Sequence, residues 1–200
     1  MLIALEGIDG TGKTTQAMGL ATTLARVGRR VLFTREPTTG SAGLRLREYL
    51  AGKRRHLSAS EELALFQADR REHVEQTIRP ALRRGWVVVT DRYYYSSAAY
   101  QGALGLNPGE ILAESEAFAP RPDLVVIFTL PLQLALARRL EARGGKVQVS
   151  EDQEYLAKVA ALYDTFQGPH LKRLDASEPP TRVLGRLLNL ALDAFREAIL

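Results

Sequence analysis

The hydrophobic and polar positions of the chain follow two alternating patterns. Short runs rich in apolar residues predict strands at residues 1–5, 30–34, 86–90, 124–130 and 170–175. Between these runs, apolar residues recur at helical spacing and predict helices at 15–27, 60–70, 73–84, 93–102, 108–118, 132–142, 151–166 and 180–199, with one more beginning at Ser41. Strands that alternate with helices join through right-handed crossovers. The pattern therefore predicts an α/β fold with a parallel sheet of about five strands and helices on both faces.

Helix boundaries follow from residues with special backbone or capping preferences. Gly28 is suited to end the first helix, because glycine adopts the left-handed conformation of a helix terminus without strain. Ser41 follows a loop that contains Pro and Gly and is predicted to cap the next helix, and Ser58 or Ser60 is predicted to cap the one after it. The sequence leaves open whether the helices at 60–70 and 73–84 are continuous or only abut.

Composition indicates one globular domain. The 200 residues are 46% hydrophobic, and no linker rich in Pro, Gly or Ser divides them, so we expect a single domain over residues 1–200. The longest uninterrupted apolar run, residues 124–128, is far too short to span a bilayer. The N-terminal stretch lacks the basic segment and cleavage site of a signal peptide, so we expect a cytoplasmic protein without membrane association.

The distribution of charge and the content of metal-binding residues indicate which kinds of ligand the chain can bind. The 27 basic residues are interleaved with 23 acidic ones, for a net charge of +4, and no basic arm stands out. Small anionic ligands therefore fit better than nucleic acid. The chain has no cysteine, and its three histidines are scattered without the spacing of metal ligands. A site for a soft metal is not expected.

One motif carries most of the functional information. Residues 7–14 read GIDGTGKT and match G-x-x-x-x-G-K-[ST], between a predicted strand and a predicted helix. In that context the backbone N–H groups cradle phosphates, Lys13 reaches the β- and γ-phosphates of ATP, and the Thr14 hydroxyl holds Mg²⁺. The residues expected to bind the ATP phosphates are Gly7, Ile8, Asp9, Gly10, Thr11, Gly12, Lys13, Thr14 and Thr15.

The motif at residues 7–14 is the phosphate-binding loop (P-loop) of many nucleotide-binding proteins. Other motifs, present or absent, indicate which class of P-loop protein the chain belongs to. A GTPase would need an N-K-x-D guanine reader, but the only asparagines, Asn107 and Asn189, do not fit, and no transporter signature of the LSGGQ kind is present. Small kinases remain. The strand at 86–90 leads into DRYYYSSAAYQG at 91–102. With EGIDGTGKTTQ at 6–16, TREP at 34–37 and LFQADRREH at 65–73, this block makes the chain resemble the thymidylate kinases.

The resemblance implies how the nucleoside of dTMP binds. Phe66 corresponds to the family's aromatic residue that stacks on thymine, and Arg70, one helical turn later, to the arginine that reaches a base carbonyl. Ser97 and Gln101 fall where the family reads the base edge. Tyr100 falls where the family packs a ring beneath the deoxyribose and leaves no room for a 2′-hydroxyl.

The resemblance also implies residues for phosphates and metal. Arg92 corresponds to the arginine that binds the acceptor phosphate, and Asp91 to a carboxylate that helps hold Mg²⁺ through water at the strand end. Asp9 falls where the family places a carboxylate near the sugar 3′-hydroxyl. Arg35 and Arg47 are further phosphate-binding candidates, although the usual REPGG is REPTTG here and Arg47 is also compatible with a solvated surface position.

A catalytic arginine is expected from the lid, at about residues 143–151. Thymidylate kinases carry this arginine either in the P-loop or in the lid, and Gly10 indicates the lid pattern. Residues 144–150 contain no arginine, so Arg143, assisted by Arg139, is the first candidate and Lys146 the second. The alternative is that both arginines only favour the C-terminal dipole of their helix.

The expected reaction is ATP + dTMP → ADP + dTDP on a P-loop kinase three-layer fold, with Mg²⁺ as cofactor and a homodimer as the assembly. The acidic pairs at 61–62 and 151–152 lie at predicted helix starts, where acids complement the helix dipole, and are not assigned to catalysis. His73 is expected to be a structural hydrogen-bonding residue. The alternatives are another nucleoside or nucleoside-monophosphate kinase and, more remotely, a P-loop regulatory ATPase or nucleic-acid-binding module.

Overall fold

A computed structural model describes residues 1–52, 57–142 and 149–197, and in this part of the chain five parallel strands form one sheet. The spatial order is β2-β3-β1-β4-β5. All four neighbouring pairs are parallel, which confirms the predicted sheet. The strands are β1 (Leu2–Glu6), β2 (Val31–Arg35), β3 (Val87–Asp91), β4 (Leu124–Thr129) and β5 (Leu171–Asp175).

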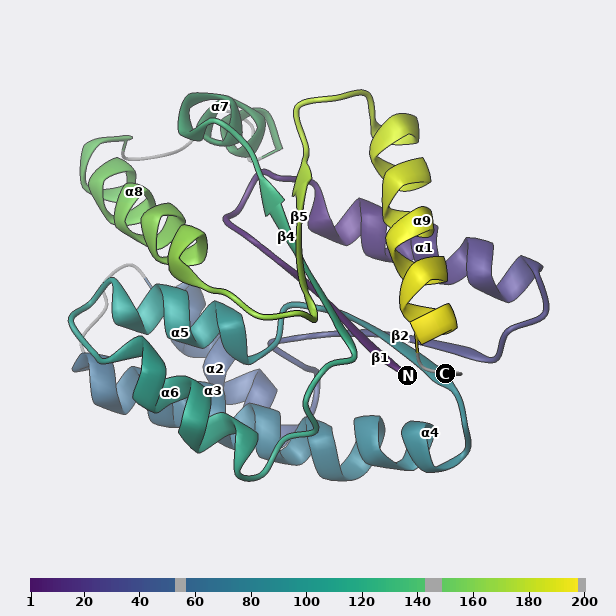
Figure 1. Ribbon diagram of the computed structural model, residues 1–200. Helices are drawn as coiled ribbons and strands as arrows, with labels where there is room; N and C mark the ends of the chain where they lie inside the picture. The colour runs from purple at the N-terminus through teal and green to yellow at the C-terminus, as the bar shows by residue number, and fades with distance from the viewer. Residues whose placement is uncertain (53–56, 143–148, 198–200) are drawn as a thin grey trace.

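Helices cover both faces of this sheet (Figure 1). Alternate residues of a strand point to opposite faces, so Val125 and Val126 of β4 enter different cores. Val126 packs with α1 and α9 on one face, and Val125 packs with α5 and α8 on the other. The helices are α1 (Lys13–Arg26), α2 (Ser41–Ala51), α3 (Ala59–His73), α4 (Arg79–Arg83), α5 (Tyr94–Gly102), α6 (Pro108–Glu116), α7 (Leu132–Ala142), α8 (Val149–Thr165) and α9 (Pro180–Glu197), with a π-helical turn η1 (Val74–Ile78) between α3 and α4.

The helix over residues 59–83 is continuous. The sequence left this open, and the structure joins α3 to α4 through the wider turn η1. Pro80, in the first turn of α4, has no N–H to donate and its ring would crowd the carbonyl four residues earlier. A π-helical turn just before it relieves that conflict without ending the helix.

Two helix starts were predicted from serines, with different outcomes. Ser58 caps α3 in a reciprocal capping box, since its hydroxyl accepts from the Glu61 N–H and the Glu61 carboxylate accepts from the Ser58 N–H. The predicted Ser41 cap of α2 is wrong, because Gly40 occupies the cap and Ser41 is already helical. The carboxylate of Glu72, from α3, instead accepts the Ser41 and Ala42 N–H groups. A distant acid therefore replaces the local cap.

The carboxyl ends of β1 and β3 lie side by side, because Leu5 pairs with Asp91 in the parallel register. The P-loop follows β1, and residues 92–102 follow β3, so the chain segments with the two strongest motifs begin at one edge of the sheet. In open parallel sheets this edge is where ligands bind. Among the described residues, no helix has both the length and the apolar character needed to cross a bilayer.

Candidate active site

The P-loop joins β1 to α1 and is closely packed, with side chains that donate to its own backbone. Gly7 has a φ of +132°, and a Cβ there would meet the Phe128 carbonyl oxygen at 2.6 Å. The Lys13 ammonium and the Thr11 hydroxyl both donate to the Ile8 carbonyl, each at 2.9 Å. Burial, with the nearby Arg92 charge adding to it, lowers the pKa of Lys13 to about 8. The lysine is held within the loop, where a phosphate group would further stabilise its charged form.

Gly10 is packed against α7. It has a φ of +91°, and a Cβ at this position would collide with the backbone carbonyl of Ala135. No side chain fits here without moving α7. The glycine that indicated a lid arginine is therefore also required by the packing of this chain.

The Mg²⁺ candidates Thr14 and Asp91 are in contact. The Thr14 hydroxyl donates to Oδ2 of Asp91, across the gap between α1 and the end of β3. The other oxygen, Oδ1, is buried and has no hydrogen-bond partner among the described residues. Residues 1–52, 57–142 and 149–197 contain no cluster of three or more His, Cys, Asp or Glu that could hold a metal by itself. A hydroxyl and one free carboxylate oxygen fit Mg²⁺, which keeps several waters and takes further ligands from substrate phosphates.

Arg92 lies at the centre of the site and has an unusual backbone. Its φ of +72° is in the left-handed region, which non-glycine residues rarely adopt outside functional sites. Nη2 donates to Oδ1 of Asp9 at 2.6 Å and to the Tyr100 hydroxyl at 3.1 Å. Nη1 donates to Ser96 Oγ at 2.9 Å and to the Gly7 carbonyl at 3.5 Å. One guanidinium thus connects the P-loop to α5.

Charges around Arg92 perturb two carboxyl groups in opposite directions. Arg92, and more weakly Lys13 and Arg139, hold the pKa of Asp9 well below its usual range despite burial. Glu6, the last residue of β1, has no exposed surface, and burial raises its pKa to about 7. The Ser96 hydroxyl, at 2.6 Å from Oε2, and the Arg92 charge offset this only in part. Glu6 begins the EGIDGTGKTTQ block, and no role was predicted for it.

A cavity of about 340 Å³ opens beside Arg92, within the range of small-molecule sites. It brings together five of the predicted acceptor-site residues, from the P-loop, α3 and α5. Arg139 of α7, predicted only as an assistant to Arg143, also lines it. The lining residues are Asp9, Pro37, Leu50, Glu62, Phe66, Arg92, Ser96, Tyr100, Gln101 and Arg139.

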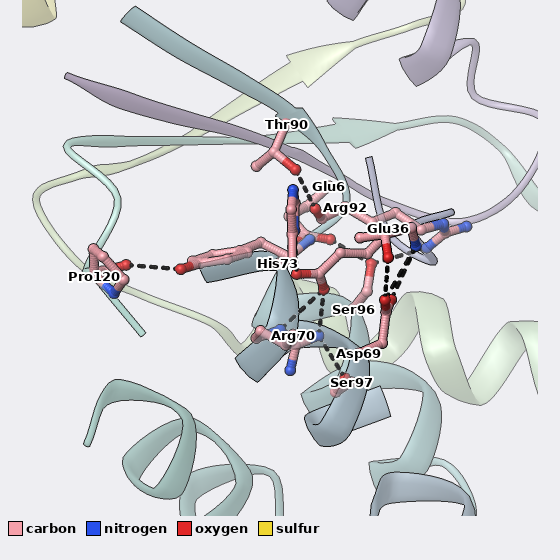
Figure 2. Close-up of polar contacts among 12 residues, drawn as sticks. Glu6, Glu36, Asp69, Arg70, His73, Thr90, Arg92, Ser96, Ser97 and Pro120 are labelled. Atoms are coloured by element: carbon pink, nitrogen blue, oxygen red, sulfur yellow. Dashed lines mark hydrogen bonds and ion pairs between the residues drawn. The ribbon is translucent and has the colours of Figure 1, made fainter. Parts of the chain in front are cut away.

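Arg70 is fully buried and largely committed to protein partners. Nε and Nη2 donate to Oε2 of Glu36 at 2.9 and 2.8 Å, and Nη2 also donates to Ser97 Oγ at 3.0 Å (Figure 2). Nη1 is buried with no partner within the described part of the chain, and Arg70, predicted to reach the base, does not line the cavity at Arg92. Ser97, predicted to read the base, contacts Arg70 instead and does not line the cavity.

Glu36 of the TREP motif was not assigned a role from the sequence, yet its carboxylate connects the buried side chains of Arg70 and His73. Besides Arg70, it contacts Nδ1 of His73 at 3.1 Å, and Nε2 of His73 contacts the Thr34 hydroxyl at 2.7 Å. Burial acts to raise the pKa of Glu36, but Arg70 and His73 together hold it below its usual value. His73 has the structural hydrogen-bonding role expected of it.

Arg35 and Arg47 do not line the cavity at Arg92. The guanidinium of Arg47 donates to the backbone carbonyls of Thr38, at 2.7 Å, and Pro37. Both arginines line a different cavity, between β2 and α2, and neither borders the cavity at Arg92. In the REPTTG loop, two backbone carbonyls accept hydrogen bonds from the Arg47 guanidinium. The positions of Arg35 and Arg47 therefore do not support the phosphate-binding role predicted for them.

The lid candidates Arg143 and Lys146 lie outside the described residues, as does most of the lid at 143–151. A further cavity of about 260 Å³ borders the P-loop, α7 and the start of α9. Arg138 of α7 closes one side by donating to the Ala176 carbonyl at 3.0 Å. This cavity and the one at Arg92 both border the phosphate loop, so the loop has room for a nucleotide on either side.

A phosphate loop that one arginine connects to a neighbouring cavity is typical of P-loop nucleoside-monophosphate kinases. The family model described as thymidylate kinase matches residues 5–186. The thymidylate kinase of Xanthomonas campestris pv. campestris (strain B100) is 47% identical over 184 residues, 92% of this chain and 79% of that protein. That of Brachyspira hyodysenteriae (strain ATCC 49526 / WA1) is 42% identical over 188 residues, 94% and 91% of the two chains. The chain belongs to the thymidylate kinase family and is an ATP-dependent nucleoside-monophosphate kinase.

Proposed function

We propose that the chain transfers the γ-phosphoryl group of ATP to dTMP by in-line displacement at Arg92, giving dTDP and ADP. The observation that carries this proposal is the set of contacts of one guanidinium, which bonds Asp9 of the P-loop and Tyr100 of the acceptor cavity. A phosphate on dTMP in this cavity would lie next to Arg92. The transferred group would then pass between two sites that share one arginine.

The donor side is built for charge stabilisation. Lys13 and the P-loop N–H groups bind the β- and γ-phosphates, and the α1 N-terminus adds a favourable dipole. Thr14 and Asp91 would hold Mg²⁺, which would neutralise charge on the phosphate oxygens. The acceptor phosphate is already anionic, so no strong general base is needed, and Asp9 stays ionised at neutral pH to orient Arg92.

The acceptor side binds the base and sugar by shape and hydrogen bonds. Phe66 offers an aromatic face for thymine, and Tyr100 occupies the space that a ribose 2′-hydroxyl would need. We propose that Nη1 of Arg70, which has no partner among the described residues, donates to a base carbonyl. We propose that Asp9 is the carboxylate nearest the 3′-hydroxyl of the sugar.

We also propose that the lid over residues 143–151 delivers a catalytic arginine. Arg139, on α7 and at the cavity wall, supports this because its charge already acts on Asp9. Arg143, four residues later in the sequence, would then close over the transferred group. Arg143→Ala is expected to lower kcat by more than tenfold, and Lys146→Ala by less. A kcat of Arg143→Ala within about threefold of wild type refutes the assignment.

We further propose a cytoplasmic homodimer, on the family resemblance. Light scattering after size exclusion is expected to give about twice the protomer mass of 22.1 kDa. A monomer under the conditions of full activity would contradict it.

An acceptor panel tests the function. ADP release is measured with ATP, Mg²⁺ and, in turn, dTMP, dUMP, dCMP, dGMP, AMP and thymidine. We expect dTMP to have the highest kcat/KM. Thymidine or a ribonucleotide as the better acceptor would overturn the proposal in favour of another kinase activity.

A further inference from the structure

Two adjacent glutamates at the start of α3 have different surroundings. Glu61 is exposed and completes the capping box with Ser58. Glu62 is 2% exposed and lines the acceptor cavity. Its Oε1 accepts from Nε2 of Gln101 at 2.9 Å, and its Oε2 accepts from the Tyr49 hydroxyl at 2.8 Å. A buried carboxylate with these contacts is not explained by the helix dipole.

The contact between Glu62 and Gln101 fixes the orientation of the Gln101 amide. Nε2 is the donor in this contact, so the amide turns its NH₂ group toward Glu62. The carbonyl oxygen Oε1 then points the other way. This oxygen is buried and has no hydrogen-bond partner among the described residues, and Gln101 lines the acceptor cavity. The reversed amide would place its oxygen against a carboxylate oxygen, so the hydrogen bond between the two side chains would be lost.

The cavity lining thus carries one acceptor of fixed position, the Gln101 amide oxygen. A candidate donor outside the lining is Arg70, whose Nη2 donates to Ser97, one helical turn before Gln101, and whose Nη1 has no partner among the described residues. The edge of thymine or uracil presents a carbonyl oxygen next to an imino N–H, and this pattern is complementary to the pair. Cytosine presents an amino group next to an unprotonated ring nitrogen, so both contacts would be lost.

We infer that Glu62 is a positioning residue for acceptor specificity: by holding the Gln101 amide oxygen toward the cavity, it selects pyrimidines with an imino N–H over cytosine. The inference rests on the proposed binding of dTMP in this cavity. Glu62 acts through Gln101 and contributes to the affinity for the base rather than to phosphoryl transfer.

The test is Glu62→Gln, measured as kcat and KM for dTMP, dUMP and dCMP. A neutral amide at position 62 accepts or donates, so both orientations of Gln101 become accessible. We expect the dTMP to dCMP ratio of kcat/KM to fall by about tenfold or more, mainly through KM. The dTMP to dUMP ratio should stay within about twofold, because both bases carry the imino N–H. Dissociation constants of the three nucleotides, measured by calorimetry without ATP, should follow the same order.

Tyr49→Phe is the matched control. It removes the other hydrogen bond to Glu62 but leaves the carboxylate acceptor of Gln101 in place. We expect its dTMP to dCMP ratio to stay within about twofold of wild type, since the amide is still oriented. If Glu62→Gln is not recovered as folded protein, Glu62→Met, which removes the acceptor with a side chain of similar length, is scored in the same way.

Two results would overturn the inference. One is an unchanged dTMP to dCMP ratio in Glu62→Gln at an unchanged melting temperature. The other is an equal loss for all three nucleotides, which would reduce Glu62 to structural support of the cavity. If wild-type protein itself does not prefer dTMP, the proposed function fails instead, and the two failures are thus distinguishable.

Discussion

The two arginines of the candidate site, Arg70 and Arg92, differ in how deeply their ion pairs are buried. Arg70 and its partner Glu36 have side chains that are 1% and 3% exposed, and they form a dry, closed pair. Arg92 and its partner Asp9 are 18% and 42% exposed, and Arg92 sits on a backbone in the left-handed region. The closed pair belongs to the framework of the cavity. The open pair accepts a strained backbone and incomplete burial, which are typical of residues that meet a substrate.

The largest expected effect comes from breaking the open pair. Arg92→Ala should lower kcat by about a thousandfold, because arginine stabilisation of the transferred phosphoryl group contributes on that order. The melting temperature should change by only a few degrees. Arg92→Lys keeps the charge but loses the planar fork, so an intermediate kcat is expected. Activity of Arg92→Ala within tenfold of wild type would place the reaction elsewhere.

Breaking the closed pair should have the opposite consequence. Arg70→Ala leaves the Glu36 carboxylate buried without its main partner, which costs about 3–5 kcal/mol of unfolding free energy. For a chain of this size the melting temperature should fall by roughly 10 °C. Arg45→Ala, at an exposed position of α2, is the control and should be nearly silent. Equal melting temperatures for the two variants would contradict the buried-pair interpretation.

Glu6, between the two pairs, links stability to pH. Its pKa is about 7 in the folded protein and 4.5 without burial, so the folded state binds the proton more tightly. Glu6 therefore contributes stability that is present below pH 4.5 and lost as the pH rises toward 7, on the order of 3 kcal/mol. Glu6→Gln should remove this decline. Denaturation series at pH 4.5 to 7.5 on both proteins test it, and parallel profiles would argue against a protonated Glu6.

The smallest effect concerns the sugar. Tyr100→Ala should reduce the preference for deoxy- over ribo-acceptors by about tenfold, because the ring is a steric barrier to a 2′-hydroxyl. Tyr100→Phe keeps the ring, loses only the hydrogen bond from Arg92 and should retain the preference. A dTMP to ribothymidine monophosphate ratio that is the same in all three proteins would remove Tyr100 from sugar selection.

The sheet and the phosphate loop could be predicted because each depends on local signals. Apolar runs separated by helical patterns determine the strands, and the spacing of Gly7, Gly12 and Lys13 is itself the motif. The proposed roles of Arg92 and Asp9 followed only from the family resemblance, and nothing in the sequence indicated their mutual contact or the positive φ of Arg92.

Residues that act through distant partners were missed for a common reason. Glu62 and Glu61 are equivalent in the sequence, and only the packing of α3 against α5 turns one of them inward to Gln101. Glu72 caps α2 from another helix, which no local pattern encodes. In the same way, the Arg47 guanidinium donates to a backbone carbonyl of the loop after Glu36. The spacing of Arg47 from the TREP motif does not reveal this contact.

The fate of the γ-phosphoryl group tests the central claim most directly. Wild-type protein is mixed with ATP labelled at the γ-position, Mg²⁺ and dTMP in a single turnover, and the labelled products are separated. The account predicts that the label appears in dTDP, that inorganic phosphate stays at background, and that Lys13→Ala slows this transfer by orders of magnitude. Label released mainly as inorganic phosphate, with dTMP unmodified, would contradict it and favour a regulatory ATPase.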